Sequence, residues 1–498
     1  ALADHLHKRD THIFVLMSDG EQTKGQVAEA RRFAVKYGLK NITVIIDNNN
    51  IQISGKTDDV MPCRICGNYR ADGWETMEVD GHDFSALYDA IKKSLEIPAP
   101  TCIIANTIIG KGVSFMENDY RYHGKTLDEK SYVKAMEELG LPPSLEKYKE
   151  LRKKKWDYPE RKFFFTPELE KGSTVVYQKD EKTDNRSAYG KALLEIAKAN
   201  KENRKYPFAV FDCDLATSVK TDLFAKEFPS NFFQVGVQEH NAATISGVVS
   251  TDKVISFFSD FGVFGVDETF NQARLNDQNW TNLKLVCTHV GLDVGEDGKT
   301  HQCIDYIGTL RNLFGFKIVI PADPNQTDRV IRYVAGQPGN WFIGMGRSKT
   351  SVITKEDGSV YFDEKYEFRY GKADIIRKGE KGYIIAMGTI LPRAVKASEI
   401  LKEKGLSIGV INMSCPTVID EEVMAEAIKT GLILTAEDHH IDTGLGATVG
   451  MYLLEKKYTG KFFRRGITEY GSSGEPEYLF KKEGLDAQSL AEFLLTCK

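Results

Sequence analysis

The feature of this sequence that most limits its fold is the alternation of short, apolar β-type runs with amphipathic helical stretches. Near the start, THIFVLMSDG precedes a helical pattern from Gln26 to Tyr37, and NITVIIDNNN follows it. Strands that alternate with helices in this way form parallel sheets. Because the alternation returns twice further along, the sequence predicts an α/β protein of three consecutive α/β domains with parallel or mixed sheets.

Changes in composition give the predicted domain boundaries. Residues 1–125 form the first domain, 185–355 the second and 366–498 the third, with a hairpin-like passage near Gly358 before the third domain. The tract 126–184 is rich in Lys and Glu and has no strand runs, so we expect helices and a linker there.

The overall charge argues against two classes of partner. A net charge of -5 and a pI near 6.1 predict no attraction to nucleic acid or to anionic lipid. No apolar run reaches the roughly 18 residues that would cross a membrane. The eight cysteines lack a disulfide framework, and the CxxC pair Cys63 and Cys66 has no second pair to complete a zinc site, which favours a cytoplasmic protein.

Polar residues follow two of the predicted strands in the first domain. Ser18-Asp19-Gly20 ends one strand, and Asn49 and Ile51 follow the next. Carboxyl ends of neighbouring parallel strands form the crevice where ligands bind. A carboxylate, an amide oxygen and a backbone carbonyl from Asp19, Asn49 and Ile51 suit Mg²⁺ or Ca²⁺ holding a diphosphate, and Gly20 would let the backbone approach the phosphates. Such residues also occur as ordinary turns and helix caps.

The pairing of SDG with NNN resembles the thiamine diphosphate signature of the transketolase family. GWETMEVDGHDFSAL and IIGKGVSFMEND are similar to the rest of that family's diphosphate-binding domain. VGVQEHNAATISG, FFSDFGVF, THVGLDVGEDGKTHQ and GMGRSK resemble its pyrimidine-binding domain, and GLGATV its C-terminal domain. The resemblance covers essentially the whole chain and implies thiamine diphosphate, with Mg²⁺ or Ca²⁺, as cofactor.

The resemblance implies roles for Glu239 and three phenylalanines. Glu239 begins an apolar helix, where burial would raise the pKa of its carboxyl group. There it would bind N1′ of the aminopyrimidine and help to remove the C2 proton of the thiazolium. Taken alone, Glu239 would be a helix N-terminal acid that the helix dipole stabilises. Phe258, Phe261 and Phe264 have the spacing of core residues, and the resemblance makes them an aromatic wall for the pyrimidine ring.

The remaining candidate residues would contact the sugar phosphate. His123, His289 and His301 correspond to catalytic histidines that contact the sugar and move protons, and Asp297 to a residue that binds its hydroxyls. Glycines in the loop GLDVGEDGKTH predict a flexible, exposed connection. Arg186, Ser218 and Arg347 lie where the family binds the substrate phosphate. His82 and the pair His439 and His440 are expected to serve structure or surface.

Three departures from the family pattern stand out. Ser18 replaces the usual glycine before the metal-binding Asp, and Lys24 replaces a glutamate that many members place at the dimer interface near the cofactor. The family's diphosphate-binding domain also begins well before the equivalent of Ala1. We therefore expect a Gly-rich diphosphate loop to be missing or to come from a separate N-terminal segment.

The function that the resemblance implies is that of a transketolase of the pentose phosphate pathway. It would transfer a two-carbon ketol unit from a ketose phosphate to an aldose phosphate through a thiamine diphosphate carbanion. The expected enzyme is a homodimer with its active sites at the subunit interface. The alternatives are an enzyme similar to 1-deoxyxylulose-5-phosphate synthase and a catalytically weak paralogue or subunit.

Overall fold

The computed structural model describes residues 1–155, 165–181 and 183–497 and divides into two compact units, Ala1–Lys162 and Phe163–Lys498. Part of the predicted linker, residues 156–164 and 182, lies outside the described residues. Among the described residues, none of the helices is long and apolar enough to span a membrane.

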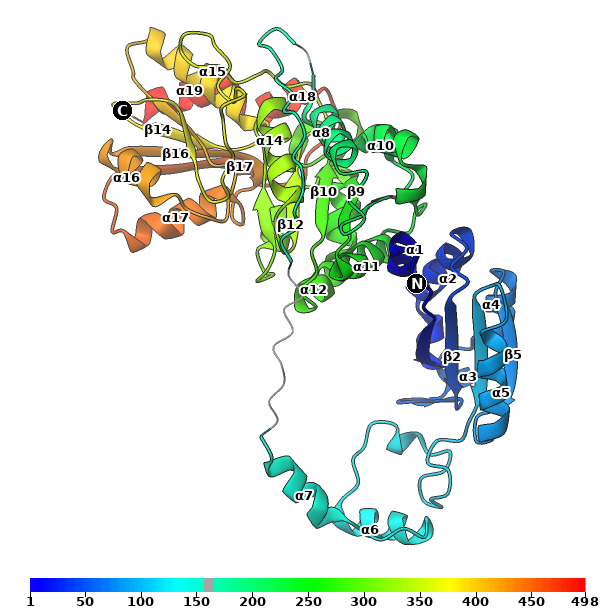
Figure 1. The fold of residues 1–498 in the computed structure, drawn as a ribbon. Helices are drawn as coiled ribbons and strands as arrows, with labels where there is room; N and C mark the ends of the chain where they lie inside the picture. Colours follow the sequence, from blue (N-terminus) through cyan, green and yellow to red (C-terminus); the bar gives the residue numbers. More distant parts are fainter. Residues whose placement is uncertain (156–164, 182, 498) are drawn as a thin grey trace. The chain divides into compact units, whose positions relative to one another are not determined.

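The first unit is built around a four-stranded parallel sheet of order β1-β2-β6-β5 (Figure 1). Its strands run over Ile13–Ser18 (β1), Ile42–Asn48 (β2), Glu75–Asp80 (β5) and Thr101–Asn106 (β6). The predicted helix after the first strand is α2, Gly25–Lys36. The other α-helices are α1 (Leu2–His7), α3 (Thr57–Val60), α4 (Ile65–Ala71), α5 (Phe84–Ser94), α6 (Glu129–Glu138) and α7 (Leu145–Lys153).

The second unit begins with a six-stranded sheet, all of whose paired strands are parallel, of order β11-β12-β10-β9-β7-β8. The strands are β7 (Phe208–Asp212), β8 (Phe232–Gln234), β9 (Ile255–Phe261), β10 (Lys284–Thr288), β11 (Lys317–Val319) and β12 (Trp341–Gly344). Helices α8 (Asn185–Ala199) and α14 (Pro324–Ala335) share a buried apolar core with this sheet.

Three further helices carry or border the candidate site in this part of the second unit. Helix α11 covers Glu239–Val249 and α12 covers Phe270–Gln278. Between β9 and α12 the chain makes a π-helical turn, η5, over Val263–Glu268. The short helices α9 (Ala216–Val219), α10 (Asp222–Glu227) and α13 (Tyr306–Leu310) complete the region.

A five-stranded mixed sheet of order β13-β15-β14-β16-β17 follows, in which only the edge strand β13 pairs antiparallel. The bounds are β13 (Asp374–Arg377), β14 (Tyr383–Ala386), β15 (Gly409–Asn412), β16 (Leu432–His440) and β17 (Lys461–Ile467). Figure 1 shows α15 and α19 on one side of it and α16 and α17 on the other. These helices, with α18, run over Ile390–Glu403 (α15), Glu421–Lys429 (α16), Leu445–Glu455 (α17), Pro476–Lys482 (α18) and Ala487–Thr496 (α19). Three successive sheets and their helices confirm the predicted α/β fold.

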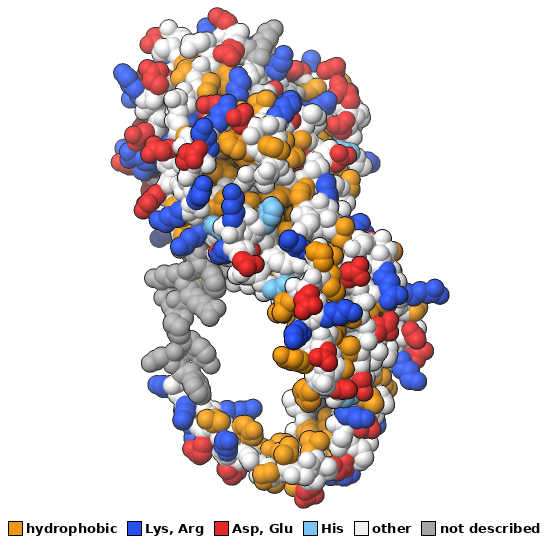
Figure 2. Space-filling model, turned by 45° about the vertical axis from the view of Figure 1, so that its right-hand side comes forward, with side chains coloured by type: hydrophobic (Ala, Val, Ile, Leu, Met, Phe, Trp, Pro, Cys, Tyr) orange, Lys and Arg blue, Asp and Glu red, His pale blue; other side chains and the backbone are white. Residues whose placement is uncertain are grey.

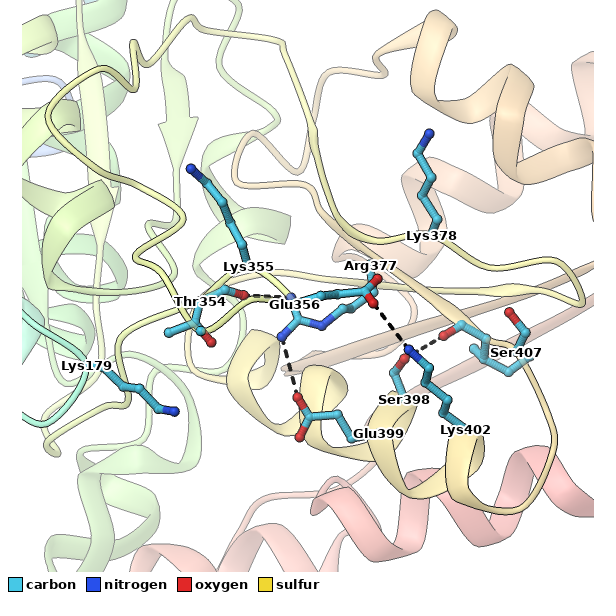
Figure 3. Close-up of a pocket in the computed structure, with 12 residues that line it drawn as sticks. Lys179, Thr354, Lys355, Glu356, Arg377, Lys378, Ser398, Glu399, Lys402 and Ser407 are labelled. Carbon is cyan, nitrogen blue, oxygen red and sulfur yellow. Dashed lines mark hydrogen bonds and ion pairs between the residues drawn. The ribbon is translucent and has the colours of Figure 1, made fainter.

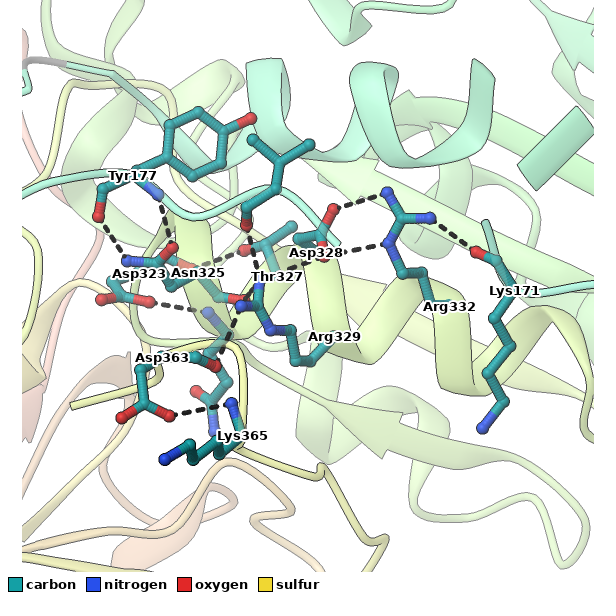
Figure 4. A network of polar contacts seen from close by, with 12 residues as sticks. Lys171, Tyr177, Asp323, Asn325, Thr327, Asp328, Arg329, Arg332, Asp363 and Lys365 are labelled. Atoms are coloured by element: carbon teal, nitrogen blue, oxygen red, sulfur yellow. Dashed lines mark hydrogen bonds and ion pairs between the residues drawn. The ribbon is translucent and has the colours of Figure 1, made fainter. Parts of the chain in front are cut away.

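The extended segment that leads into the second unit is held on α14 by side chains of that helix (Figure 4). Asn325 pairs with the backbone of Tyr177 through two hydrogen bonds, at 2.8 and 2.9 Å. Arg329 donates to the carbonyl of Val175, and Arg332 to that of Lys171. Asp328, which is fully buried, binds both guanidinium groups. The pairing lets these charges lie inside the unit and satisfies backbone groups that would otherwise be buried unbonded.

The predicted hairpin near Gly358 is present. Thr354 and Val360 form an antiparallel bridge, and Gly358 turns the chain with φ of 85°. On the face seen in Figure 2, acidic and basic side chains are interspersed and do not gather into one basic surface.

Candidate functional site

The polar residues that follow β1 and β2 meet at one edge of the first unit's sheet. Ser18 and Asp47 are register partners, so the residues after them lie side by side. Asp19 is 2% exposed, and its Oδ2 accepts from the backbone N–H of Asn50 at 2.7 Å and the hydroxyl of Thr57 at 3.2 Å. Within the described part of the chain both bonds go to Oδ2, which leaves Oδ1 for a cation.

Asn49 and Ile51 stand beside this carboxylate. The side-chain carbonyl of Asn49 accepts from the N–H of Ile51 at 2.9 Å and keeps a second lone pair, and Ile51 is buried. A Cβ on Gly20 would come within 3.1 Å of the Gln52 side chain, so the absence of a side chain keeps this edge open. The residues present therefore fit a hard, oxygen-preferring cation.

The two departures from the family pattern near this edge, Ser18 and Lys24, lie in different surroundings. Ser18 is the last residue of β1 and lies outside the positive-φ residues, so a serine fits there as expected. Its N–H donates to the Glu21 carboxylate at 2.6 Å. Lys24 is exposed and precedes α2. His123, also in the first unit, is exposed after a 3-10 turn over Tyr120–Tyr122.

In the second unit the candidate residues gather at the carboxyl edge of the six-stranded sheet. Glu239 is the first residue of α11 and is 6% exposed. Oxygens of Glu239 and Asp260 and the sulfur of Cys213 lie within 4.8 Å of one another. Burial raises the pKa of Asp260 well above its ordinary value, and that of the Cys213 thiol as well. Asp260 was not among the predicted site residues, although an acid inside the apolar run FFSDF is a signal that could have found it.

Two of the three predicted phenylalanines share one aromatic cluster with two histidines. Thr288 and Phe261 are register partners on β10 and β9, so His289 follows its strand beside Phe261. Their ring centroids are 3.7 Å apart. Phe264 stacks on Phe261 at 6.1 Å and meets the edge of His301 at 5.5 Å.

Phe258 is fully buried within β9, with Phe211 and Leu285 as its register partners on the two neighbouring strands. Among the described residues, the ring contacts that involve Phe261 and Phe264 do not include Phe258. Its role in the pyrimidine wall stays a prediction.

Two arginines lie close to this cluster. Arg186 donates to the carbonyl of Ser218 at 3.0 Å, and Arg347 donates to the carbonyl of Val294 at 2.7 Å and lies 3.8 Å from the Asp297 carboxylate. Burial, together with the charges of Arg186, Arg347 and His301, lowers the pKa of His289 to about 3. The structure thus brings His289, which is neutral at physiological pH, within reach of the charges of Arg186, Arg347 and His301. Asp297 joins this group through Arg347, and Ser218 joins it through its backbone carbonyl.

The glycine-rich loop after His289 is only partly exposed, which corrects the expectation. Gly291–Thr300 forms 3-10 turns broken at Gly295 and Gly298, and its first half is buried. Asp293 accepts from the N–H of Ser348 at 2.7 Å, and a Cβ on Gly291 would collide with Asp438. The apolar Leu292 and Val294 are fully buried and fix the loop, whereas Glu296 and Asp297 are exposed.

The other singled-out residues have structural settings. His82 accepts from the N–H of Ile108, and the buried His439 from that of Ile307. All eight cysteines are free thiols. Asp267, Cys303 and Asp305 form a second close group within 4.8 Å.

A hollow of about 300 Å³ lies elsewhere, beside β13 and α15 (Figure 3). Three of its cations pair with acids, Arg377 with Glu399, Lys402 with Glu356 and Lys355 with Asp363. Figure 3 shows Lys179 and Lys378 pointing in different directions, so its cations do not converge on one ligand.

Successive α/β sheets, an oxygen-rich strand edge and a buried glutamate close to Asp260 of β9 are the features expected of a thiamine diphosphate enzyme fold. Family models match in the same order: the transketolase thiamine diphosphate binding domain at residues 3–160, the pyrimidine binding domain at 181–351 and the C-terminal domain at 371–490. The chain belongs to the transketolase family.

Individual relatives agree with this assignment. Transketolase-like protein 2 of Mus musculus is 29% identical over 98% of this chain and 76% of its own length. The protein of the same name from Bos taurus is 30% identical over 89% of this chain and 70% of its own. The crystal structure of transketolase from Campylobacter jejuni superposes with a TM-score of 0.83 at 22% identity, over 99% of this chain and 79% of that one, which shows the shared fold.

Proposed function

We propose that this chain is a transketolase that transfers a two-carbon ketol unit from a ketose phosphate to an aldose phosphate. The observation that carries the proposal is that the buried Glu239 lies close to Asp260 of β9, while the next residue of that strand, Phe261, contacts His289 and His301. A buried carboxyl group, a ring face and two imidazoles are the groups needed to hold an aminopyrimidine and to move protons on a bound sugar.

Each end of the cofactor has candidate residues in this chain. Asp19, Asn49 and Ile51 would hold the metal that binds the diphosphate, with Gly20 beside it. Glu239 would bind the pyrimidine nitrogen, and Phe258, Phe261 and Phe264 would form the aromatic wall for the ring. Bound thiamine diphosphate supplies a nucleophilic carbon that can accept and release a carbonyl fragment.

The sugar phosphate would meet the polar residues around His289. A histidine whose pKa is about 3 is neutral at pH 7, so it would exchange hydrogen bonds with a sugar hydroxyl without adding charge. Arg186 and Arg347 would bind the phosphate, because a guanidinium fits a phosphate in a bidentate way. Ser218, Asp297, His301 and His123 complete the proposed substrate set.

The proposal also covers the metal, the oligomeric state and the cellular pathway of the enzyme. We propose Mg²⁺ or Ca²⁺ as the metal, a homodimer with active sites at the subunit interface as the active form, and the cytoplasmic pentose phosphate pathway as its place. These points rest on membership of the family.

A two-substrate assay tests the function. The purified chain, with thiamine diphosphate and Mg²⁺, receives xylulose 5-phosphate and ribose 5-phosphate in one reaction and pyruvate with glyceraldehyde 3-phosphate in another. Ketol transfer only in the first supports the proposal. Product only in the second would show a synthase, and cofactor binding without product in either would show a catalytically silent family member.

A further inference from the structure

We propose that Asp260 is a positioning residue for Glu239 and that the two carboxyl groups share a single proton. The existence of the pair concerns the protein alone. Its effect on the cofactor rests on the proposed function.

The first support is the placement of the two groups. Asp260 lies in β9 and is 0% exposed, and Glu239 starts α11. Their oxygens are within 4.8 Å of each other. Oδ1 of Asp260 accepts from the N–H of Phe261 at 2.7 Å, while Oδ2 is buried and has no nitrogen or oxygen donor among the described residues. The Cys213 thiol, a weak donor, is the side chain that can bond to this carboxyl group. A buried carboxylate oxygen without a donor is strongly disfavoured, whereas a protonated one can donate.

The charges that face Asp260 also favour a protonated carboxyl group. The titratable groups around it are Glu239, Asp212 of β7, Cys213 after β7 and Cys287 of β10. Asp212 is already satisfied by Gln234, Thr221 and the N–H of Leu215. Burial raises the pKa values of both thiols, so both are neutral. The titratable groups that face Asp260 are thus acids or neutral thiols, and none of these groups is a cation that could balance a negative charge on Asp260.

Two carboxyl groups this close and this buried do not both ionise, and they titrate as one pair. One proton held by the pair leaves it with a single negative charge. When a neutral aminopyrimidine binds, Asp260 could donate to one oxygen of Glu239 and orient the other toward the ring. The pair would thus keep Glu239 able to carry a proton at a higher pH than an isolated carboxylate could.

The pair itself is tested on the protein without cofactor. Infrared difference spectra between acid and alkaline pH are recorded for the wild type, Asp260→Asn, Glu239→Gln and the double variant. We expect a protonated carboxyl band in the wild type at neutral pH that Asp260→Asn removes and whose midpoint Glu239→Gln moves to lower pH. An unchanged midpoint in Glu239→Gln would mean that burial alone protonates Asp260, and the proposal would be wrong.

Asp260→Ser serves where Asp260→Asn does not fold, because it also removes the carboxyl group. Asp374→Asn is a matched control, since burial raises the pKa of Asp374 to about 7 in a different sheet. It should remove a carboxyl band of its own and leave the Glu239-dependent shift in place. If it also abolished that shift, the signal would not belong to the pair.

The effect on the cofactor is tested by equilibrium titration with thiamine diphosphate between about pH 5 and about pH 9. Above the pKa of the pair, binding needs a proton, so affinity should fall about tenfold per pH unit. Asp260→Asn should move the start of this fall to lower pH, and Asp374→Asn should not. Identical profiles for wild type and Asp260→Asn would overturn the proposal while the proposed function stands. A wild type that shows the infrared pair but binds no cofactor would contradict the proposed function instead.

Discussion

The imidazole of His289 lies against the ring of Phe261, with centroids 3.7 Å apart and planes inclined by 30°. The backbone of His289 has a φ of 60°, in the left-handed region that residues other than glycine rarely adopt. Its Nδ1 is 2.7 Å from the hydroxyl of Thr288, which fixes the ring on its other side. The contact is thus maintained against backbone strain, a condition typical of functional positions.

The strain at His289 predicts that a glycine variant at this position is more stable than an alanine variant, the reverse of the usual order. His289→Gly should be more stable than His289→Ala by roughly 0.5 to 1 kcal/mol, because alanine pays the left-handed penalty and the entropy of unfolded glycine offsets only part of it. Denaturant unfolding gives the comparison. The control pair is Thr288→Gly and Thr288→Ala, at a strand position where glycine should be the less stable. If the glycine variant were the less stable one at both positions, the backbone of His289 would not be strained.

Asp19→Asn should weaken the Mg²⁺-dependent binding of thiamine diphosphate by about 100-fold or more, since a charged metal ligand becomes neutral. The substitution keeps an oxygen for Asn50 and Thr57, so the unfolding free energy should fall by only about 1 to 2 kcal/mol. Calorimetric titration at several Mg²⁺ concentrations measures the first effect. Asp58→Asn, which neutralises an exposed carboxylate in α3 next to Thr57, should bind as the wild type does. Unchanged metal dependence in Asp19→Asn would rule out Asp19 as a ligand.

Glu239→Gln should slow the exchange of the cofactor's C2 proton by orders of magnitude, because an amide cannot perform the same proton transfer to the pyrimidine nitrogen. NMR of the bound cofactor in deuterated solvent measures the exchange. Glu268→Gln is a suitable control, since Glu268 is a more exposed glutamate in the neighbouring π-helical turn. Normal exchange in Glu239→Gln would disprove its assignment.

Removing the Asn325 side chain should release the segment at Tyr177. Two hydrogen bonds to the backbone are lost, so Asn325→Ala should lower the unfolding free energy by about 2 kcal/mol. Hydrogen exchange of the Tyr177 amide, the donor to Asn325, should accelerate at the same time. Asn312→Ala removes hydrogen bonds within one exposed helix end and should leave the Tyr177 amide protected. Full protection of the Tyr177 amide against exchange in Asn325→Ala would show that Asn325 does not hold this segment.

His439 should make the protein sensitive to acid. Burial lowers its pKa to about 3, and its Nε2 accepts from the N–H of Ile307, so the folded state keeps it neutral. Below its ordinary pKa of about 6.5 the unfolded chain binds the proton and the folded one does not, so stability is lost as the pH falls. The unfolding free energy of the wild type relative to His439→Gln should therefore drop by up to about 1.4 kcal/mol per pH unit between about pH 6 and about pH 4. Parallel curves for the two proteins would show that His439 does not contribute.

The sheets and the strand-end residues were predictable because they depend on local pattern. The β-type runs before Asp19 and Asn49 became β1 and β2, and the helix expected from Gln26 is α2. Parallel pairing then places the two strand ends together, as it also places His289 beside Phe261.

Other features depend on contacts between distant segments, which no local pattern encodes. The loop after His289 has the glycines of an exposed connection, yet Leu292 and Val294 are buried and Asp293 binds the backbone of Ser348. The acid within FFSDF marks Asp260 as unusual, but only the approach of α11 shows that it faces Glu239.

The π-helical turn η5 has a consequence for the phase of the helix that follows it. A π turn closes its hydrogen bonds one residue later than an α turn, so every later side chain points in a direction one residue out of step with an uninterrupted α-helix. Phe264 lies within the turn, and α12 begins after it with Gln272, Ala273 and Asn276 on its buried face. Asn276 donates to the carbonyl of Ala243 in α11. With this offset, Phe264 contacts Phe261 and His301, while Asn276 of the following helix meets α11.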